Sequence, residues 1–400
     1  MTNKHDSTTT VRHRKATSVL ITAGLLGGVV ATTAMSATPV AAASAGSHLV
    51  DTARPVFSHP TDITNPLMPV NGTEQYVQLG REGTEVLRHE LTLLADTRVI
   101  DVDGVPVEAR VMQFMAYADG RLIEIAIDYF AQDDSGSVWY LGENVTNYAD
   151  GVVLNHKGTW LAGRDGPPGM IMPAHPQVGD VYRPENIPGL VFEETTVDAI
   201  GLIVEGPRGP VSGAIRVTER SPGVPEEVKV FAPGYGEFQT DVAAGDEHTG
   251  IAVSLAIDAR DGPAPRGLAR IAGAARRVFD AAPRENWNRS EKLASTVSSV
   301  WAGLPSDNPP RLQAQMGDAV AALTDAVSAR DVAATQAAAI AVRHAEVDLA
   351  EQYTDVDETD MARLTNWRLQ LQLDRAAGNQ PGVLSDRLII AAISDRTPHD

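Results

Sequence analysis

Ile127–Glu143 reads IDYFAQDDSGSVWYLGE, and this stretch decides the fold that we expect. Its centre, residues 133–136 (DDSG), has the chemistry of a turn, because Asp and Ser side chains bond to nearby backbone and Gly accepts a positive φ. Apolar side chains recur at every second position on both sides of it, for example Ile127, Tyr129 and Val138. That alternation is typical of half-buried strands. The sequence therefore predicts a β-hairpin that places aromatic and acidic side chains next to one another.

Similar signals extend from Glu74 to about Asp258. Short apolar or alternating runs are separated by turns that contain Gly, such as Asp103-Gly104 and Asp119-Gly120. Strands joined by short turns form an antiparallel sheet, which must curl or close to protect its edges. We expect an antiparallel β-rich domain over residues 74–258, curled or barrel-like. Its runs are Tyr76–Leu79, Val86–Leu94, Val107–Tyr117, Leu122–Phe130, Val152–Leu154, Leu202–Glu205, Val211–Glu219, Val228–Phe231 and Phe238–Val242.

One long insertion, Ala162–Glu185, interrupts this pattern. It contains five Pro and four Gly, which argue against a helix or a central strand. Loops of this length in compact domains are often functional. Two interpretations stay open: the insertion contributes to a binding face, or it is an ordered cover over the open end of the sheet.

Helical periodicity begins after a linker at residues 259–266. Apolar side chains then recur at spacings of three and four, as in Leu312, Met316 and Leu323. Short connections make neighbouring helices antiparallel, so we expect residues 267–396 to form an α-helical bundle. Asp331 and Asp357 are the expected N-caps of two of its helices. The expected helices are Gly267–Ala282, Asn288–Leu304, Leu312–Ala329, Asp331–Tyr353, Asp357–Ala377 and Leu384–Asp395.

Residues 1–45 have the features of a secretory signal peptide. Four basic residues precede the apolar, small-residue segment Ser18–Met35, and A-x-A cleavage motifs follow it. A retained membrane anchor is the alternative, since the segment is nearly long enough to span a bilayer. Residues 46–73 would be a lead-in and an ordered loop. Five Lys against 28 Arg is typical of a GC-rich bacterial gene, so the predicted location is secreted or extracytoplasmic.

Charge and composition narrow the possible partners. Without residues 1–45 the chain has 29 basic and 51 acidic residues, a net charge of −22. Such a field repels nucleic acid and anionic membranes and attracts cations or basic partners, although it also serves solubility alone. The chain contains no Cys, which excludes disulfides and thiolate metal sites. We expect no nucleic-acid binding and no stable membrane insertion after signal cleavage.

The hairpin supplies the first candidate site. Carboxylates can bind cations or act as general acid and base, and aromatic faces beside carboxylates bind sugars. The alternative is a turn with solvated acids and core aromatics. The spacing of the acids does not match an EF-hand loop. The candidate ligand-binding residues are Asp128, Tyr129, Asp133, Asp134, Trp139, Tyr140 and Glu143.

The second candidate site lies in the helical part. His344, Asp348 and Glu351 share one helix face at i, i+4 and i+7, and Asp360 begins the next helix. Such side chains are ligands for a divalent metal cofactor such as Zn, Fe or Mn. Polar groups on an otherwise apolar face need partners, so a salt-bridge network with arginines is the alternative. The arginines available for it are Arg343, Arg363, Arg368, Arg375 and Arg387.

No recognised catalytic motif is present. The sequence lacks G-x-S-x-G, H-E-x-x-H, the phosphate-binding G-x-x-x-x-G-K-[ST], and S-x-x-K followed by K-T-G. Serine-based hydrolysis and nucleotide chemistry therefore have no support. Five histidines are scattered over the strand-rich part, and we expect most of them at the surface or in loops.

The run DYFAQDDSGSVWYLGE resembles secreted bacterial proteins of unknown function that share D-[WY]-[YF]-A-Q-D-x-x-G-x-V-W-Y-x-G-E. The resemblance covers about Phe57–Thr240 and implies export and the two-part division, but no activity. The function expected from the sequence is an exported, non-catalytic binding protein with an acidic-aromatic ligand face. Its partner would be a small molecule, glycan, cation or protein. The alternative is a metal-binding or metal-dependent hydrolytic protein that uses the cluster in the helices.

Overall fold

The predicted hairpin is present in the computed structural model, which describes residues 46–242, 247–305 and 307–396. Arg121–Gln132 (β5) and Val138–Ala149 (β6) pair antiparallel, with Asp128 directly opposite Glu143. The predicted signal peptide lies outside the described residues. The turn between β5 and β6 has Gly136 at a φ of +93°, a conformation that residues with a Cβ rarely adopt.

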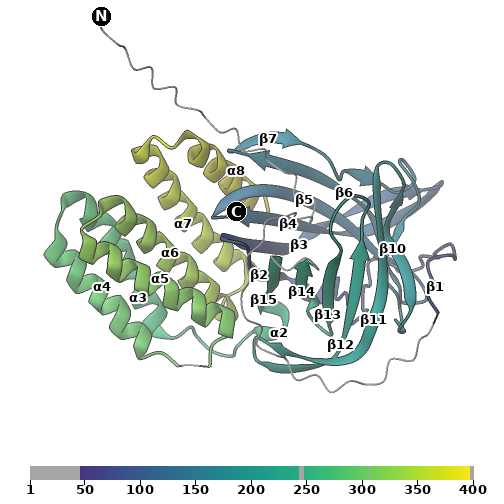
Figure 1. The fold of residues 1–400 in the computed structure, drawn as a ribbon, viewed down its shortest axis with the longest axis horizontal. Coiled ribbons are helices and arrows are strands. Elements are labelled where there is room, and N and C mark those ends of the chain that lie inside the picture. Colours follow the sequence, from purple (N-terminus) through teal and green to yellow (C-terminus); the bar gives the residue numbers. More distant parts are fainter. Residues whose placement is uncertain (1–45, 243–246, 306, 397–400) are drawn as a thin grey trace, which may run out of the picture.

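Among the described residues, fifteen strands form one sheet in which every pairing is antiparallel except that of β1 with β10. The hydrogen-bonded path runs β1-β10-β11-β12-β13-β14-β15-β2-β3-β4-β5-β6-β7, and β8 and β9 both pair with β6 (Figure 1). The predicted strand runs are therefore confirmed. The remaining strands are His48–Leu49 (β1), Gln75–Glu82 (β2), Glu85–Val102 (β3), Val105–Ala118 (β4), Val152–Asn155 (β7), Trp160–Leu161 (β8), Gly169–Met172 (β9), Asp180–Ile187 (β10), Val191–Gly206 (β11), Gly209–Arg220 (β12), Glu227–Ala232 (β13), Gly236–Val242 (β14) and Glu247–Ser254 (β15).

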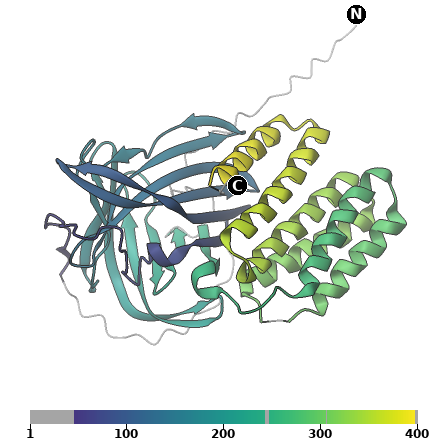
Figure 2. The same cartoon turned by 180° about the vertical axis from the view of Figure 1, so that it is seen from behind.

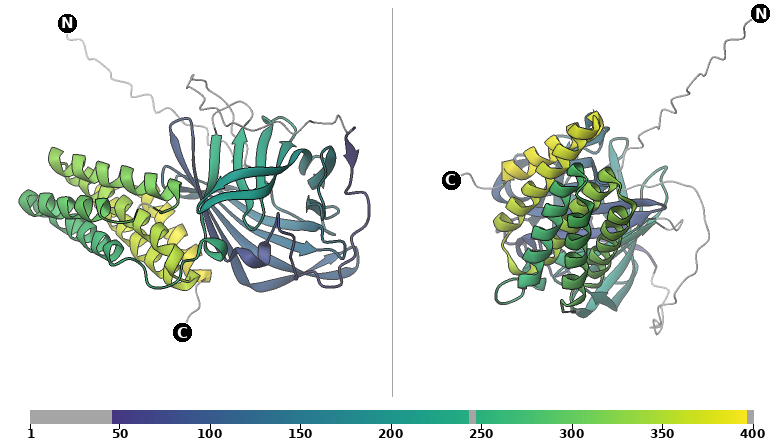
Figure 3. Two further views of the ribbon diagram at one scale, coloured as in Figure 1. Left: turned by 90° about the horizontal axis from the view of Figure 1, so that it is seen from below. Right: turned by 90° about the vertical axis from the view of Figure 1, so that its left-hand side faces the viewer.

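The sheet curls on itself, but its two ends are not hydrogen-bonded to each other in the described part of the chain (Figure 3). Packing joins them instead, because β9 lies against β10. Gly169 makes this contact possible: a Cβ at this position would lie 1.7 Å from the backbone oxygen of Pro184. The curl therefore depends on one residue without a side chain at the seam between β9 and β10.

The prediction that Ala162–Glu185 excludes a central strand is wrong. The segment contains all of β9, and β10 begins inside it and pairs with both β1 and β11. Pro184 is accommodated at an irregularity, since the register of β10 against β11 shifts between Tyr182 and Glu185. A bulge leaves a residue outside the regular ladder, so proline costs little there.

Helices follow the last strand, as predicted. Asp331 caps its helix through a hydrogen bond from the backbone N–H of Ala334, but Asp355, not Asp357, caps the next one. Asp357 lies in the first turn of that helix, where a negative charge is also favourable. The helices are Val70–Thr73 (α1), Leu255–Asp258 (α2), Arg266–Ala281 (α3), Trp287–Ala302 (α4), Pro310–Ala329 (α5), Val332–Ala350 (α6), Val356–Ala377 (α7) and Gln380–Arg396 (α8).

The C-terminal helices pack against the outer face of the sheet (Figure 2). Tyr117 from β4 stacks on Trp367 from α7, with ring centroids 5.8 Å apart. Ile389 and Ile393 from α8 belong to the same buried cluster. Neighbouring side chains of a strand point to opposite faces, so the residues on either side of Tyr117 face the inside of the curl. The helices thus cover one face of these strands and leave the other to a cavity.

Candidate binding cavity

A cavity of about 170 Å³ lies inside the curled sheet. Strands from both halves of the sheet line it, and Lys157, which is exposed at the surface, also reaches it and marks its mouth. Aromatic rings form much of its wall, including Tyr76, Phe114 and Phe231. Seven carboxyl groups and two lysines supply most of its polar lining. The carboxyl groups belong to Glu124, Asp128, Glu143, Glu185, Glu193, Glu219 and Glu237.

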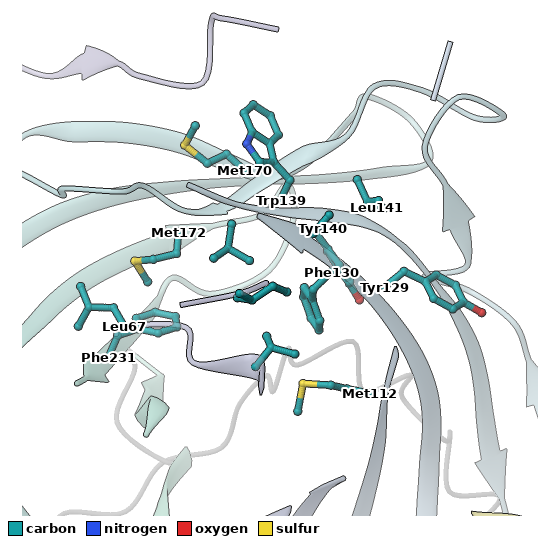
Figure 4. Close-up of a cluster of buried hydrophobic side chains, with 14 of the residues drawn as sticks. Leu67, Met112, Tyr129, Phe130, Trp139, Tyr140, Leu141, Met170, Met172 and Phe231 are labelled. Atoms are coloured by element: carbon teal, nitrogen blue, oxygen red, sulfur yellow. The ribbon is translucent and has the colours of Figure 1, made fainter. Parts of the chain in front are cut away.

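The hairpin contributes three of these carboxyls on adjacent strands. Asp128 is buried and accepts a hydrogen bond of 2.9 Å from the hydroxyl of Tyr140. Tyr140 stacks on Phe130 with ring centroids 5.0 Å apart. Figure 4 shows these two rings side by side, whereas Tyr129 points the other way. The inward face of the hairpin therefore combines acids and aromatic rings, as the sequence predicted.

The insertion brings the opposite wall of the cavity against the hairpin. Glu185, at the end of the insertion, is close enough to Glu143 to raise the pKa of that carboxyl, and it accepts a hydrogen bond of 3.0 Å from the indole of Trp160. Glu193 lies directly opposite Glu185 on β11. The seam between β6 and β10 therefore brings buried carboxyls from both strands together.

A buried lysine lies on the far side of the cavity. The ammonium of Lys229 is 2.9 Å from Oε1 of Glu219, 3.5 Å from Oε2 of Glu227 and 3.9 Å from Oε2 of Glu237. Burial acts to lower the pKa of Lys229, but these surrounding carboxylates raise it well above its usual value. Lys229 therefore stays charged, and its single ammonium group lies among three carboxylates.

Burial and crowding keep several of the carboxyls protonated near neutral pH. Burial raises the pKa of Glu124 to about 8, and the neighbouring Asp128 adds to this effect. Burial also raises the pKa of Asp128 and of Glu185 to about 7 in each case. Burial, followed by the charges of Asp128 and Glu185, raises the pKa of Glu143 well above its usual value. A positive charge placed beside these carboxyls would therefore favour their ionised form.

Four of the predicted ligand-binding residues lie elsewhere. Asp133 stabilises the turn, since its carboxylate accepts from the N–H groups of Ser135 and Ser137 and from the indole of Trp139. Asp134 accepts hydrogen bonds from Ser58. The Tyr129 hydroxyl contacts Arg98 and Asn144 on the outer side of the sheet. Asp133, Asp134, Tyr129 and Trp139 therefore match the alternative interpretation of the hairpin, in which its acids and aromatics belong to the turn and the core. Asp128, Tyr140 and Glu143 line the cavity.

The predicted metal ligands are not gathered around one point. Each acid faces an arginine: Asp348 is 2.6 Å from Arg88, Glu351 is 2.7 Å from Arg363, and Asp360 is 2.7 Å from Arg396. The ring of His344 packs on Trp367 instead, at 5.0 Å. No group of three or more His, Cys, Asp or Glu in the described ranges could hold a metal ion. This geometry is that of the salt-bridge alternative. Two of the arginines, Arg88 and Arg396, were not among those expected from the sequence.

Most of the far wall of the cavity was missed by the sequence reasoning. Glu193, Glu219, Lys229 and Glu237 lie on strands that the sequence did not single out as part of a site. On β13 the local signal was the alternation of charged residues with valines, which is also typical of a solvated face. His89, one of the scattered histidines, is buried in the same cavity.

Comparisons with protein-family models, with curated protein sequences and with solved structures found no match for this chain. None of the helices in the described ranges combines the length and the apolar character needed to cross a membrane.

The raised pKa values predict that the protein loses stability as the pH rises. The folded carboxyls hold protons that the unfolded chain has already released, so unfolding becomes easier until the pH passes their folded pKa values. Between about pH 6.5 and about pH 8.5 the buried histidines oppose this trend only weakly, because burial lowers the pKa of His89 and of His344 to about 4 and the unfolded rings lose their last protons just above pH 6.5. We expect a lower thermal midpoint at the higher pH. Glu124→Gln should flatten the dependence, and a midpoint that rises over this range would contradict the prediction.

Proposed function

We propose that this protein is a non-catalytic binding protein that holds a small organic cation inside the curled sheet. The observation that carries the proposal is the convergence of seven carboxyl groups on one enclosed space with aromatic walls. The hairpin supplies Asp128 and Glu143 to it, and the insertion supplies Glu185. This is the acidic-aromatic ligand face of the sequence analysis, turned inward.

The charges of the site favour a cation over other ligands. Burial raises the pKa values of Glu143 and Glu193, and repulsion between the crowded carboxylates raises them further. A cation among them relieves this repulsion and makes charge-assisted hydrogen bonds with the ionised carboxylates. An anionic ligand would instead add to the repulsion among the carboxylates. Binding should therefore release protons from the carboxyls near neutral pH.

The size and the walls of the cavity favour an organic ion over a bare metal ion. An engineered protein cavity of about 150 Å³ binds benzene, so about 170 Å³ accommodates a single ring or a short chain. Aromatic faces attract organic ammonium groups through cation–π contacts. Tyr76, Phe130 and Tyr140 supply such faces beside the carboxyls.

The test compares three probes of similar shape: cyclohexylammonium, cyclohexanol and cyclohexanecarboxylate. Calorimetric titration at about pH 8 should detect binding of the ammonium probe, with proton release seen as a dependence of the heat on the buffer. The Asp128→Asn variant, which keeps an acceptor for Tyr140, should bind the ammonium probe about tenfold or more weakly, since it removes a hydrogen bond to a charged group.

Glu205→Gln is the matched control, because Glu205 is an exposed acid on β11, away from the cavity. It removes the same charge and should change the affinity less than about twofold, since exposed charges are screened. Equal binding of the neutral and the ammonium probe, or equal effects of the two variants, would refute the proposal.

We also infer that the protein is exported, on the basis of the signal-like residues 1–45. Cell fractionation followed by N-terminal sequencing tests this, and a protein found only in the cytoplasm and still beginning at Met1 would exclude it. The helices of residues 267–396 would act as a bundle that braces the outer face of the sheet. Packing of α3 to α8 onto one another and of α8 onto β5 supports this role.

A further inference from the structure

Two hydroxyl groups in the cavity lack hydrogen-bond partners. Tyr182 and Thr195 are each 1% exposed, and neither the phenol oxygen nor Oγ1 has a partner among the described residues. Buried polar groups are almost always hydrogen-bonded, because leaving one unsatisfied is unfavourable. Two such groups in one cavity therefore require an explanation.

The two hydroxyls belong to one feature. Tyr182 and Thr195 are directly opposite each other on β10 and β11, so their side chains lie on the same face of the sheet. Both line the cavity. A pair of adjacent hydroxyls can donate to one ligand atom or accept from it.

The surroundings of the pair indicate which ligand group it takes. Thr195 is opposite Glu219 on the next strand, and Glu219 accepts from the ammonium of Lys229. Lys229 is already held among carboxylates, so an anionic ligand group would meet net negative charge here. A neutral hydroxyl fits better, since it can both donate and accept.

We propose that the ligand is a small hydroxylated amine, of the amino alcohol or amino sugar class. This inference rests on the proposed function. The ammonium group contacts the carboxyls of Asp128 and Glu143, and a ligand hydroxyl bonds to Tyr182 and Thr195. Sugar-like ligands also match the aromatic walls. The hydroxyl pair would then determine specificity among amines.

The test uses cyclohexylamine and its 2-, 3- and 4-hydroxy derivatives, the aminocyclohexanols. At least one aminocyclohexanol should bind the wild-type protein about three- to tenfold more tightly than cyclohexylamine, as expected for one or two neutral hydrogen bonds. The double variant Tyr182→Phe/Thr195→Val should lose this advantage and keep its affinity for cyclohexylamine.

The double variant should fold, because it deletes only unpaired hydroxyls, and its thermal midpoint should be equal to or above that of the wild type. Tyr140→Phe is the matched control: its hydroxyl bonds to Asp128, so its loss should affect all four probes alike.

The outcomes separate this inference from the proposed function. If no amine binds the wild type, the proposed function itself fails. If all four amines bind the wild type equally, or if the hydroxyl advantage survives in the double variant, only the present inference is overturned. A double variant that is less stable than the wild type would also overturn it, since the hydroxyls would then have partners within the protein.

Discussion

The variant Gly169→Ala is expected to lose at least about 3 kcal/mol of stability or to fail to fold, which is the upper range for overpacking. Its Cβ would lie 1.7 Å from the backbone oxygen of Pro184 and 2.5 Å from the carbonyl carbon. No rotamer can relieve a clash between a Cβ and backbone, so β9 and β10 must separate. Denaturant unfolding measures the loss directly.

Gly273→Ala is the matched control for this experiment. Gly273 lies within α3, and a Cβ there would meet nothing within 4 Å. Since alanine is the better helix former, this change should leave stability unchanged or raise it by about 0.5–1 kcal/mol. If Gly169→Ala proved as stable as the control, β9 would not be packed on β10 as described. Separation of these strands would also remove Glu185 from Glu143, so any soluble Gly169→Ala protein should bind cations weakly.

A second large effect is expected from Arg363→Met, with a loss of about 3–5 kcal/mol. Arg363 is 1% exposed and connects the helices to the sheet. Its guanidinium is 2.7 Å from Glu351 and donates a hydrogen bond of 2.6 Å to Gln75 on β2. Its positive charge, with that of Arg88, also holds the pKa of Glu90 at about 2 despite burial. Methionine would fill similar space but leave buried carboxylates without their cation.

Arg276→Met provides the comparison on the surface. Arg276 pairs with Asp280 one helical turn away, both half-exposed, at 3.1 Å. Exposed pairs at i, i+4 contribute about 0.3–0.5 kcal/mol, so the unfolding midpoint should barely move. A similar small effect for Arg363→Met would mean that the buried acids are not held by that arginine, and the salt-bridge interpretation of Asp348, Glu351 and Asp360 would be wrong.

The hairpin shows how much of the structure a local sequence pattern can predict. Turn chemistry at residues 133–136 and alternation on both sides predicted β5 and β6 correctly. The alternation also separates two faces, but it does not say which face is turned inward. Asp128 and Glu143 face the cavity, whereas Tyr129 lies on the other side of the sheet. Both faces of this hairpin carry polar and aromatic groups, so the sequence offered no means of choosing between them.

The prediction for the insertion was wrong, and only some arginine partners of the helical acids were identified, for a different reason. Proline and glycine content argued against strands in Ala162–Glu185, but the bulge that accommodates Pro184 and the close approach at Gly169 exist only when β9, β10 and β11 are together. The acids on α6 and α7 were recognised as needing partners. Two of those partners, Arg88 and Arg396, lie on a distant strand and at the end of the last helix. Helical spacing alone cannot identify them.

The sequence by itself determined most of the strands, the helices, their order and the hairpin acids, because these depend on side-chain periodicity and turn chemistry within about ten residues. Only the tertiary structure decided that Asp128 and Glu143 meet Glu185, Glu193 and Lys229 around one cavity. That convergence depends on how far the sheet curls, and the curl is set by packing between segments far apart in the chain. The tertiary structure also decided the protonation of the site, since a pKa shifts only when the fold buries the group or brings other charges close to it.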